Sequence, residues 1–311
     1  MPPRHPAAQQ FPNRPFSVTE AMMNGVGRGR LRARDVVAPF TGVRIPVGHA
    51  LTLADRCRGF ALRMPHDAAF SHTTAALLHG IPVPEALEHD TTLHVVVPAT
   101  RRAVGARDIR GHEMHLPSTD VVHRLGLPIT TVERTWCDLS AVLDRVALLA
   151  AGDRILFHED PLASRGSLTA AVDLYRARRG IRALRSTLPL LSDRAESPRE
   201  SQLRLLLLDS GFPAPEVNLV IGDTAGRKVA RVDLAYPAWK VAIEYEGDHH
   251  RTDQKQWRRD IARTRDLQAL GWTVIRVTLA DLIAPAELLA TIRHHLTTPL
   301  TRTFSRNTRS S

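Results

Sequence analysis

The sequence contains few cysteine and aromatic residues and no long apolar run, and each shortage argues against a class of protein. Its two cysteines, Cys57 and Cys137, fit neither a zinc motif nor a disulfide framework, so both are expected to be small buried side chains. No segment approaches the roughly 20 uncharged apolar residues of a membrane span. The start of the chain is rich in proline and arginine and lacks the apolar stretch of a secretory signal. These absences predict a cytoplasmic protein without a membrane partner.

Acidic side chains are outnumbered by basic ones. The chain of 311 residues carries 42 Lys and Arg against 32 Asp and Glu, a formal net charge of +10. An excess of this sign favours polyanions such as DNA, RNA or an acidic membrane, but it does not choose among them. Aromatic residues make up 5% of the chain, which is few for a protein that stacks the bases of a single strand. Composition therefore disfavours a reader of single strands and leaves both DNA and RNA as partners, and a homodimer is compatible with the sequence.

The length is sufficient for two domains with small additions. Shifts in composition and in hydrophobic pattern divide the chain further. We expect a disordered lead at 1–15, a small helix-turn-helix at 16–48, an α+β domain at 49–160, a helical connector at 161–195, a compact α/β unit at 196–300 and a disordered tail at 301–311. The predicted fold class is α/β, with a C-terminal mixed sheet flanked by helices.

The clearest pattern in the C-terminal unit is a β-hairpin with arms at 231–236 and 241–246. A two-residue turn at Ala238-Trp239 sorts the cross-strand pairs by face. The apolar pairs, expected in the core, are Tyr236 with Val241, Leu234 with Ile243 and Val232 with Tyr245. The pairs on the opposite face are Ala235 with Ala242, Asp233 with Glu244 and Arg231 with Glu246. A single register therefore accounts for both faces.

This register makes Asp233 and Glu244 the candidate metal ligands. Their Cβ atoms would lie about 5 Å apart, where like charges repel unless a cation separates them. Oxygen ligands of this kind suit Mg²⁺ or Mn²⁺, and Glu246 would lie on the same face. The alternative is a solvated outer face of the hairpin. The paired register, the third acid and the histidines after Gly247 favour the metal site.

Two further residues have a structural and a functional interpretation of similar weight. Glu200 follows Ser197 by three residues at the start of a helix, so a capping box explains it, and a role as metal or water ligand is the alternative. His250 follows the hairpin, where it would act as a general base beside a metal-bound water or lie in solvent.

Arg263 lies on a helix predicted over 256–270, which ends at Gly271 before a core strand at 272–278. An ion pair with Asp260, three residues earlier, is the preferred interpretation. In the alternative, Arg263 reaches the scissile phosphate or orients an acid. A last helix is expected at about 286–296.

The order of these elements resembles the PD-(D/E)XK nuclease superfamily, which has a restriction-endonuclease-like fold. The stretch VDLAYPAWKVAIEYEGDHHR followed by RRDIARTRDLQALGWTVIRVT looks like relatives of the very-short-patch repair endonuclease. The resemblance covers 196–296. It implies that Asp233 and Glu244 bind the metal, that Glu200 is the acid of the first helix and that His250 is the histidine after the glycine. Glu246 stands where the superfamily has lysine, a departure that the repair-endonuclease branch shares.

The N-terminal segment resembles a reduced winged helix-turn-helix. Ser17 and Glu20 form a capping-box signal for a helix that ends near Met23, before a turn at Asn24-Gly25. A second helix and a wing at 40–44 would follow. The arginines expected to meet phosphates or guanine edges are Arg28, Arg30, Arg32, Arg34 and Arg44. A basic solvated helix is the alternative.

Residues 49–160 are similar to the AbiEi-type antitoxins of abortive-infection systems. The residues that carry this likeness are Ser71, Ala75, Ala76, His79, Gly80, Arg134, Thr135, Asp138 and Leu139. Ser71 and Gly80 bound a predicted helix, 93–98 is a predicted strand, and Thr130 with Glu133 forms a second capping-box signal. His72 and His79 lie almost two helical turns apart and are interpreted as structural.

Together these observations predict a metal-dependent DNA endonuclease fused to a DNA-binding, antitoxin-like half. Mg²⁺ on Asp233 and Glu244 would polarise the scissile phosphate, Glu246 or His250 would accept the proton of the attacking water, and Arg263 would steady the phosphate. The family likeness implies a role in phage defence, restriction or DNA repair. The alternatives are an inactive DNA-binding regulator or antitoxin, and a nuclease directed at RNA.

Overall fold

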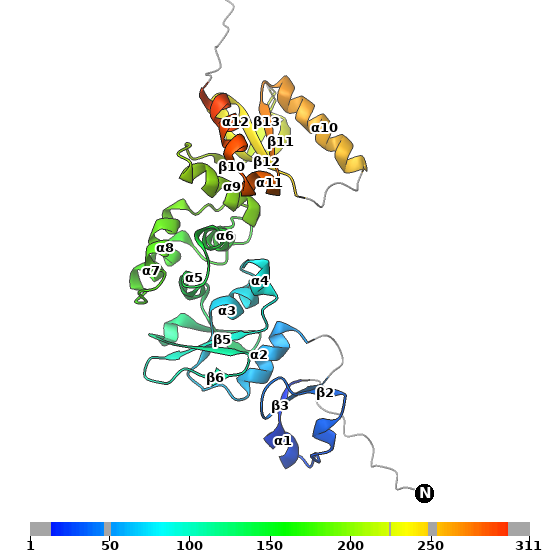
Figure 1. The fold of residues 1–311 in the computed structure, drawn as a ribbon, viewed down its shortest axis with the longest axis vertical. Helices are drawn as coiled ribbons and strands as arrows, with labels where there is room; N and C mark the ends of the chain where they lie inside the picture. Colours follow the sequence, from blue (N-terminus) through cyan, green and yellow to red (C-terminus); the bar gives the residue numbers. More distant parts are fainter. Residues whose placement is uncertain (1–13, 47–50, 224, 248–253, 298–311) are drawn as a thin grey trace, which may run out of the picture. The chain divides into compact units, whose positions relative to one another are not determined.

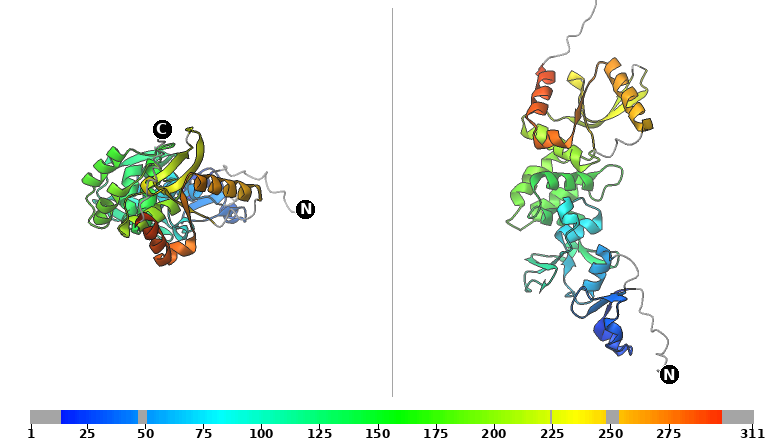
Figure 2. Two further views of the ribbon diagram at one scale, coloured as in Figure 1. Left: turned by 90° about the horizontal axis from the view of Figure 1, so that it is seen from above. Right: turned by 45° about the vertical axis from the view of Figure 1, so that its right-hand side comes forward.

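The computed structural model describes residues 14–46, 51–223, 225–247 and 254–297, with the backbone alone for 254–260. The chain is an α/β protein in which the described residues form three sheets flanked by helices (Figures 1 and 2). It divides into two compact units, one of residues 1–151 and 162–190 and one of residues 152–161 and 191–311. The predicted connector at 161–195 is helical, but most of it belongs to the first unit. Among the described helices none is both long and apolar enough to cross a membrane.

The first unit begins with a three-stranded sheet, ordered β1-β3-β2. Its elements are β1 Phe16–Ser17, α1 Val18–Met23, η1 Arg30–Arg32, β2 Val36–Val37 and β3 Val43–Pro46. Ser17 caps α1 by accepting the amide N–H of Glu20 at 3.0 Å, as predicted. The predicted second helix is wrong, because only the three residues of η1 are helical. Glycines at 25, 27 and 29 explain this, since glycine is a poor helix former.

A mixed six-stranded sheet follows, ordered β6-β7-β5-β4-β9-β8. Its strands are β4 Ala69–Phe70, β5 Leu93–Pro98, β6 Gly105–Ala106, β7 Ile109–Met114, β8 Val121–Arg124 and β9 Leu127–Thr130. The accompanying helices are α2 Leu53–Ala61, α3 His72–His79, α4 Glu85–Glu88, η2 Ser118–Asp120, α5 Val132–Leu139, α6 Arg145–Leu156, α7 Arg165–Leu174, α8 Ile181–Thr187 and η3 Leu188–Leu190. The predicted strand at 93–98 and the end of α3 at Gly80, which has a φ of +77°, are confirmed.

The cap of α5 and the two cysteines were both predicted from local sequence. Thr131, not Thr130, caps α5 by accepting the N–H of Arg134, because the hydroxyl of Thr130 bonds to the hydroxyl of Thr135. Cys57 and Cys137 are both buried and free, as expected. Burial raises the pKa of the Cys57 thiol to about 12, so this thiol is an inert packing residue.

The second unit is built on a four-stranded sheet, ordered β10-β11-β12-β13. Its elements are α9 Pro198–Asp209, β10 Glu216–Gly222, β11 Lys228–Tyr236, η4 Pro237–Trp239, β12 Val241–Tyr245, α10 Gln254–Ala269, β13 Thr273–Val277, α11 Leu279–Ile283 and α12 Ala286–Thr297. Only β12 and β13 run parallel in this sheet. Helix α10 covers one face, and α9, α11 and α12 lie on the other (Figures 1 and 2). Apolar clusters fill both interfaces.

The hairpin register is confirmed where β11 and β12 pair. The paired residues are Leu234 with Ile243, Ala235 with Ala242 and Tyr236 with Val241. The connection is longer than the predicted two-residue turn, because η4 and a left-handed Lys240 form it. The predicted pair of Val232 with Tyr245 is wrong. Val232 packs instead with Ala235 and Leu267, on the face of α10.

Candidate functional site

The candidate site lies where the β11–β12 ladder ends. Pairing of β10 with β11 is interrupted opposite Asp233, where Asn218 adopts a left-handed φ of +49°. The ladder between β11 and β12 also stops at Leu234. Instead of a backbone pair, Oδ2 of Asp233 accepts the amide N–H of Tyr245 at 2.8 Å. Asp233 and Glu244 are therefore neighbours, but the contact runs through a side chain and not through the predicted cross-strand pair.

Glu244 is held by an arginine from α10. Its side chain is 7% exposed, and Nη2 of Arg263 donates to its Oε2 at 2.9 Å. Nη1 of the same guanidinium donates to the carbonyl of Arg231 at 3.2 Å. Arg263 thus links β11 to β12 and fixes the orientation of Glu244. The side chain of Asp260, its predicted partner, lies outside the described residues.

Glu200 reaches the same region from α9. Ser197 caps this helix by accepting the N–H of Glu200, as the capping box requires. The carboxylate of Glu200, however, accepts the N–H of Glu196 at 3.0 Å and the side-chain amide of Asn218 at 2.8 Å. A capping box with Ser197 therefore accounts for only part of the contacts of Glu200. Glu200 fixes Asn218 at the point where the β10–β11 pairing is interrupted.

The electrostatics of this region suit a cation. Burial raises the pKa of Asp233, against the stabilising effect of the Tyr245 amide and the Arg263 guanidinium. Burial also raises the pKa of Glu200, and the negative charge of Asp233 raises it further. Ionising both acids in a partly desolvated region is costly without nearby positive charge. The donors are carboxylate oxygens, which Mg²⁺ and Mn²⁺ prefer, so the residues fit such an ion with water and phosphate oxygens as its other ligands.

The remaining residues predicted for this site either form other ion pairs or lie outside the described residues. The predicted pair of Arg231 with Glu246 is wrong, because the strands no longer pair beyond Leu234. Arg231 bonds to Glu196 at 2.6 Å, and Glu246 bonds to Arg276 on β13. His250 lies outside the described residues.

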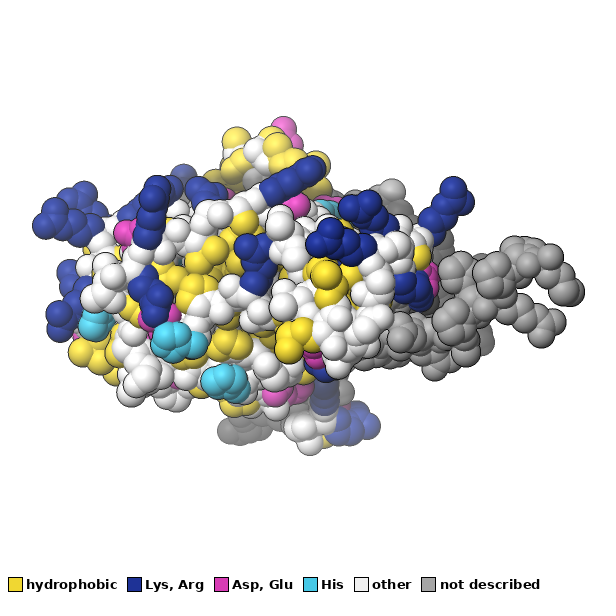
Figure 3. All heavy atoms as spheres, turned by 90° about the horizontal axis from the view of Figure 1, so that it is seen from below, with side chains coloured by type: hydrophobic (Ala, Val, Ile, Leu, Met, Phe, Trp, Pro, Cys, Tyr) yellow, Lys and Arg dark blue, Asp and Glu magenta, His cyan; other side chains and the backbone are white. Residues whose placement is uncertain are grey.

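A basic pocket in the first unit is a candidate surface for phosphate. Its volume is about 650 Å³, and four of its lining residues are arginines, namely Arg44, Arg56, Arg63 and Arg107. Arg44 and Arg63 donate to main-chain carbonyls, at 2.8 Å and 2.5 Å. Within the described part of the chain, the buried Nε of Arg56 has no hydrogen-bond partner. The face of the molecule drawn in Figure 3 carries more Lys and Arg than Asp and Glu side chains.

Only one of the five predicted DNA-binding arginines lines this pocket. Arg44 does so, whereas Arg30 forms a two-bond ion pair with Asp35. Arg28, Arg32 and Arg34 are exposed outside it. The sequence prediction missed the other pocket arginines because they come from α2, the segment after it and the β6–β7 turn, which approach one another only in the fold.

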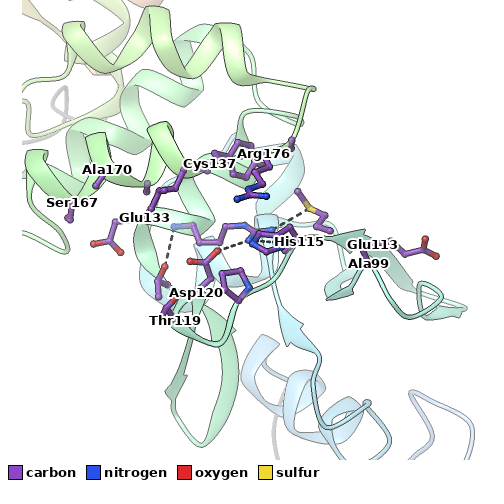
Figure 4. A pocket seen from close by; sticks show the side chains of 18 residues that line it. Ala99, Glu113, His115, Thr119, Asp120, Glu133, Cys137, Ser167, Ala170 and Arg176 are labelled. Carbon is purple, nitrogen blue, oxygen red and sulfur yellow. Dashed lines mark hydrogen bonds and ion pairs between the residues drawn. The ribbon is translucent and has the colours of Figure 1, made fainter.

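A second pocket, of about 690 Å³, is drawn in Figure 4, and Asp120, Arg134 and Tyr175, which belong to a buried ion network, are among its lining residues. Arg134 is 5% exposed and donates to Asp138 at 2.9 Å, to Asp120 at 2.8 Å and to the carbonyl of His115. The hydroxyl of Tyr175 donates to Asp138 at 3.0 Å. Arg134 and Asp138 belong to the antitoxin-like pattern. Their contacts connect α5 to the segment between β7 and β8 and to the chain after α7, which is a structural role.

The comparisons with known proteins identify relatives. No protein-family model matches the chain. The chain is 32% identical over 225 residues to the Mycobacterium tuberculosis proteins MT2308 and Rv2248, both uncharacterized, with 72% of this chain and 79% of each relative covered. The crystal structure of the M. tuberculosis protein Rv2827c gives a TM-score of 0.41 at 15% identity, covering 68% of this chain and 84% of that one.

Proposed function

The chain belongs to the family of the M. tuberculosis protein Rv2248, and we propose that it is a metal-dependent DNA endonuclease. The observation that carries the proposal is the pair of acids at the open end of the β11–β12 ladder. Asp233 contacts the backbone next to Glu244, and both are set in a partly buried region with Glu200 nearby. A carboxyl that is costly to ionise, such as that of Asp233, held beside a second acid on the neighbouring strand, is the expected form of a metal site.

Asp233 and Glu244 would hold Mg²⁺ or Mn²⁺. When bound, the ion would supply positive charge to the scissile phosphate and acidity to a water. Arg263 orients Glu244 and offers a guanidinium to the same region. Glu200, through Asn218, maintains the interruption of the sheet at Asp233. His250 is proposed to take the proton of the attacking water, because Glu246 is already paired with Arg276.

DNA is the proposed substrate because the C-terminal unit resembles DNA-cleaving nucleases, and the net charge of +10 and the arginine-lined pocket of the first unit suit a polyanion. Duplex DNA binds through its phosphates, and arginine is well suited to them. The antitoxin-like half would supply binding to DNA, and the C-terminal unit would supply cleavage. Phage defence, restriction and repair are the settings in which such a combination is expected.

The test is cleavage of supercoiled and mismatched DNA by the purified chain with Mg²⁺, with Mn²⁺ and with EDTA. We expect metal-dependent nicking or cutting that falls at least about 100-fold in Asp233→Asn and in Glu244→Gln, the scale on which loss of a group that stabilises developing charge reduces rate. Glu287→Gln, an exposed acid on α12, is the matched control and should stay within about twofold of the wild type.

Two outcomes would overturn the proposal in different ways. Retention of DNA without cleavage of any substrate would favour a DNA-binding regulator. The neutralisation of Glu244 by Arg263, and the presence of Glu246 where the superfamily has lysine, are the observations in favour of that reading. Metal-dependent cleavage of RNA but not of DNA would establish the RNA-directed alternative.

A further inference from the structure

Three histidines from three elements meet in the first unit. They are His72 at the start of α3, His94 on β5 and His112 on β7. One ring nitrogen from each lies within 4.8 Å of the others. Strands β5 and β7 pair in parallel, and this pairing places His94 opposite Arg110 and His112 opposite Val96. Residues that lie 22 and 18 positions apart in sequence therefore converge on a single point, which the sequence pattern did not reveal.

The closest approach in this cluster has the spacing of two ligands on one ion. Nε2 of His112 lies 3.1 Å from Nδ1 of His94. Two nitrogens bound tetrahedrally to zinc at about 2.05 Å would lie roughly 3.3 Å apart. The ring of His72 is stacked on that of His112 with centroids 3.7 Å apart. Without an ion this contact is a hydrogen bond between two neutral imidazoles, and it would be replaced when both nitrogens turn their lone pairs to a metal. The stacked rings of His72 and His112 would also have to rotate so that their in-plane lone pairs meet on one ion.

The imidazoles are in the protonation state that metals bind. His72 and His94 are each 3% exposed. Burial lowers the pKa of His94 and of His112 to about 4, and it lowers the pKa of His72 well below its usual range. All three rings are therefore neutral at pH 7, and each has a lone pair to donate.

The backbone and a neighbouring side chain fix His72. Its φ is +48°, a left-handed conformation that is uncommon for residues other than glycine and that clusters at ligand-binding positions. Nδ1 of His72 lies 3.0 Å from the hydroxyl of Ser71, which leaves Nε2 as the metal-binding atom. A hydrogen bond to the other ring nitrogen is the usual support for a metal-binding histidine. Ser71 is the N-cap residue of α3, but its hydroxyl makes no capping bond.

We propose that His72, His94 and His112 bind a divalent transition-metal ion of the Zn²⁺ type. Imidazole suits zinc, cobalt, nickel and copper, whereas Mg²⁺ prefers oxygen, so this site is chemically distinct from Asp233 and Glu244. Three protein ligands leave a fourth position open. Positive charge from Arg110 acts on all three histidines, so a small anion such as hydroxide or chloride is favoured as the fourth ligand. The bound ion would join the start of α3 to β5 and β7.

The experiment uses the full chain, stripped of metal with a chelator and titrated with Co²⁺, whose visible absorption reports coordination, followed by displacement with Zn²⁺. We expect one equivalent with the bands of a four-coordinate nitrogen site. His112→Gln should weaken binding at least about 100-fold, the upper end of what loss of even a supporting residue causes. His112 is half-buried, so the fold is expected to tolerate this change.

Controls separate this site from the other histidines and from the acidic site. His294→Gln combined with His295→Gln removes an adjacent pair on α12 and should leave the cobalt spectrum unchanged. Asp233→Asn should also leave it unchanged, so failure of the nuclease proposal would not affect this one. X-ray absorption of the zinc-loaded wild type should show three imidazole ligands. This measurement uses only the wild-type protein, so it does not require that a variant folds correctly. Fewer than three imidazoles, or a cobalt spectrum that survives His112→Gln, would overturn the assignment.

Discussion

At the residue scale, His79 shows how one buried side chain sets a response to pH. It is 5% exposed, and its Nε2 donates to the carbonyl of Thr130 at 2.8 Å. Burial lowers its pKa, against the raising effect of the Thr130 carbonyl, while Arg124 lowers it and Glu133 raises it. Because the folded pKa lies below the unfolded value of about 6.5, the unfolded chain gains the proton first as pH falls. The contribution of His79 to the free energy of unfolding is therefore complete above about pH 6.5, and it is lost as the pH falls from there towards the folded pKa.

The prediction is a difference between variants, since other buried histidines titrate in the same direction. The variant His79→Gln lacks the contribution of His79 to this pH dependence. Its free energy of unfolding, measured by urea denaturation, should therefore fall less between pH 7 and pH 5 than that of the wild type. His123→Gln, an exposed residue of β8, should retain the wild-type slope. Equal slopes for the wild type and His79→Gln would show that His79 does not titrate on unfolding.

At the scale of the elements, local signals predicted the helices and strands that have clear caps or apolar patterns, such as α3, α9, β5 and the β11–β12 hairpin, but not α2, α6 or β10. Non-local contacts produced the errors of pairing. Ser17, Ser197 and Gly80 bound their helices as expected, because capping and left-handed turns depend on neighbouring residues only. The face of Val232 was wrong because it depends on the interruption at Asn218, which lies on another strand. Asp233 and Glu244 were found by their spacing in one hairpin. Partners such as Asn218, Arg56 and His112 come from elements distant in sequence, and no local pattern reveals them.

The last residues of α6, from 152 on, belong to the second unit, and their buried contact with α9 yields a prediction. Oδ2 of Asp153 on α6 accepts Nη2 of Arg204 at 2.6 Å and the hydroxyl of Ser201 at 2.7 Å, and Asp153 is 1% exposed. Asp153→Ala would leave the buried guanidinium without this carboxylate, at a cost of about 3–5 kcal/mol in the free energy of unfolding of the second unit. Asp173→Ala, at an exposed site on α7, should cost less than about 0.5 kcal/mol. Urea denaturation of the two variants measures the difference, and comparable costs would refute the assigned role of the pair.

At the scale of the whole molecule, the positive charge makes a prediction about salt. Binding of duplex DNA releases condensed counterions, so the logarithm of the association constant should fall linearly with the logarithm of salt concentration, with a slope of about −0.9 per phosphate contacted. The net charge of +10 and the arginine-lined pocket favour several such contacts. Substitution at the pocket should change the slope itself, whereas a remote charge acting through the general field should change it much less.

The double variant Arg63→Gln and Arg107→Gln tests whether this pocket contacts phosphate. Both side chains are exposed at the pocket rim, so their loss should reduce the slope by about one contact each and weaken binding to all DNA sequences alike. Arg185→Gln, which removes an exposed arginine of α8 outside the pocket, is the charge control and should leave the slope unchanged. Fluorescence anisotropy with a labelled duplex at increasing salt measures all three slopes. If the double variant keeps the wild-type slope, the phosphates are contacted elsewhere, and the excess charge of the first unit acts only by attracting DNA over a distance.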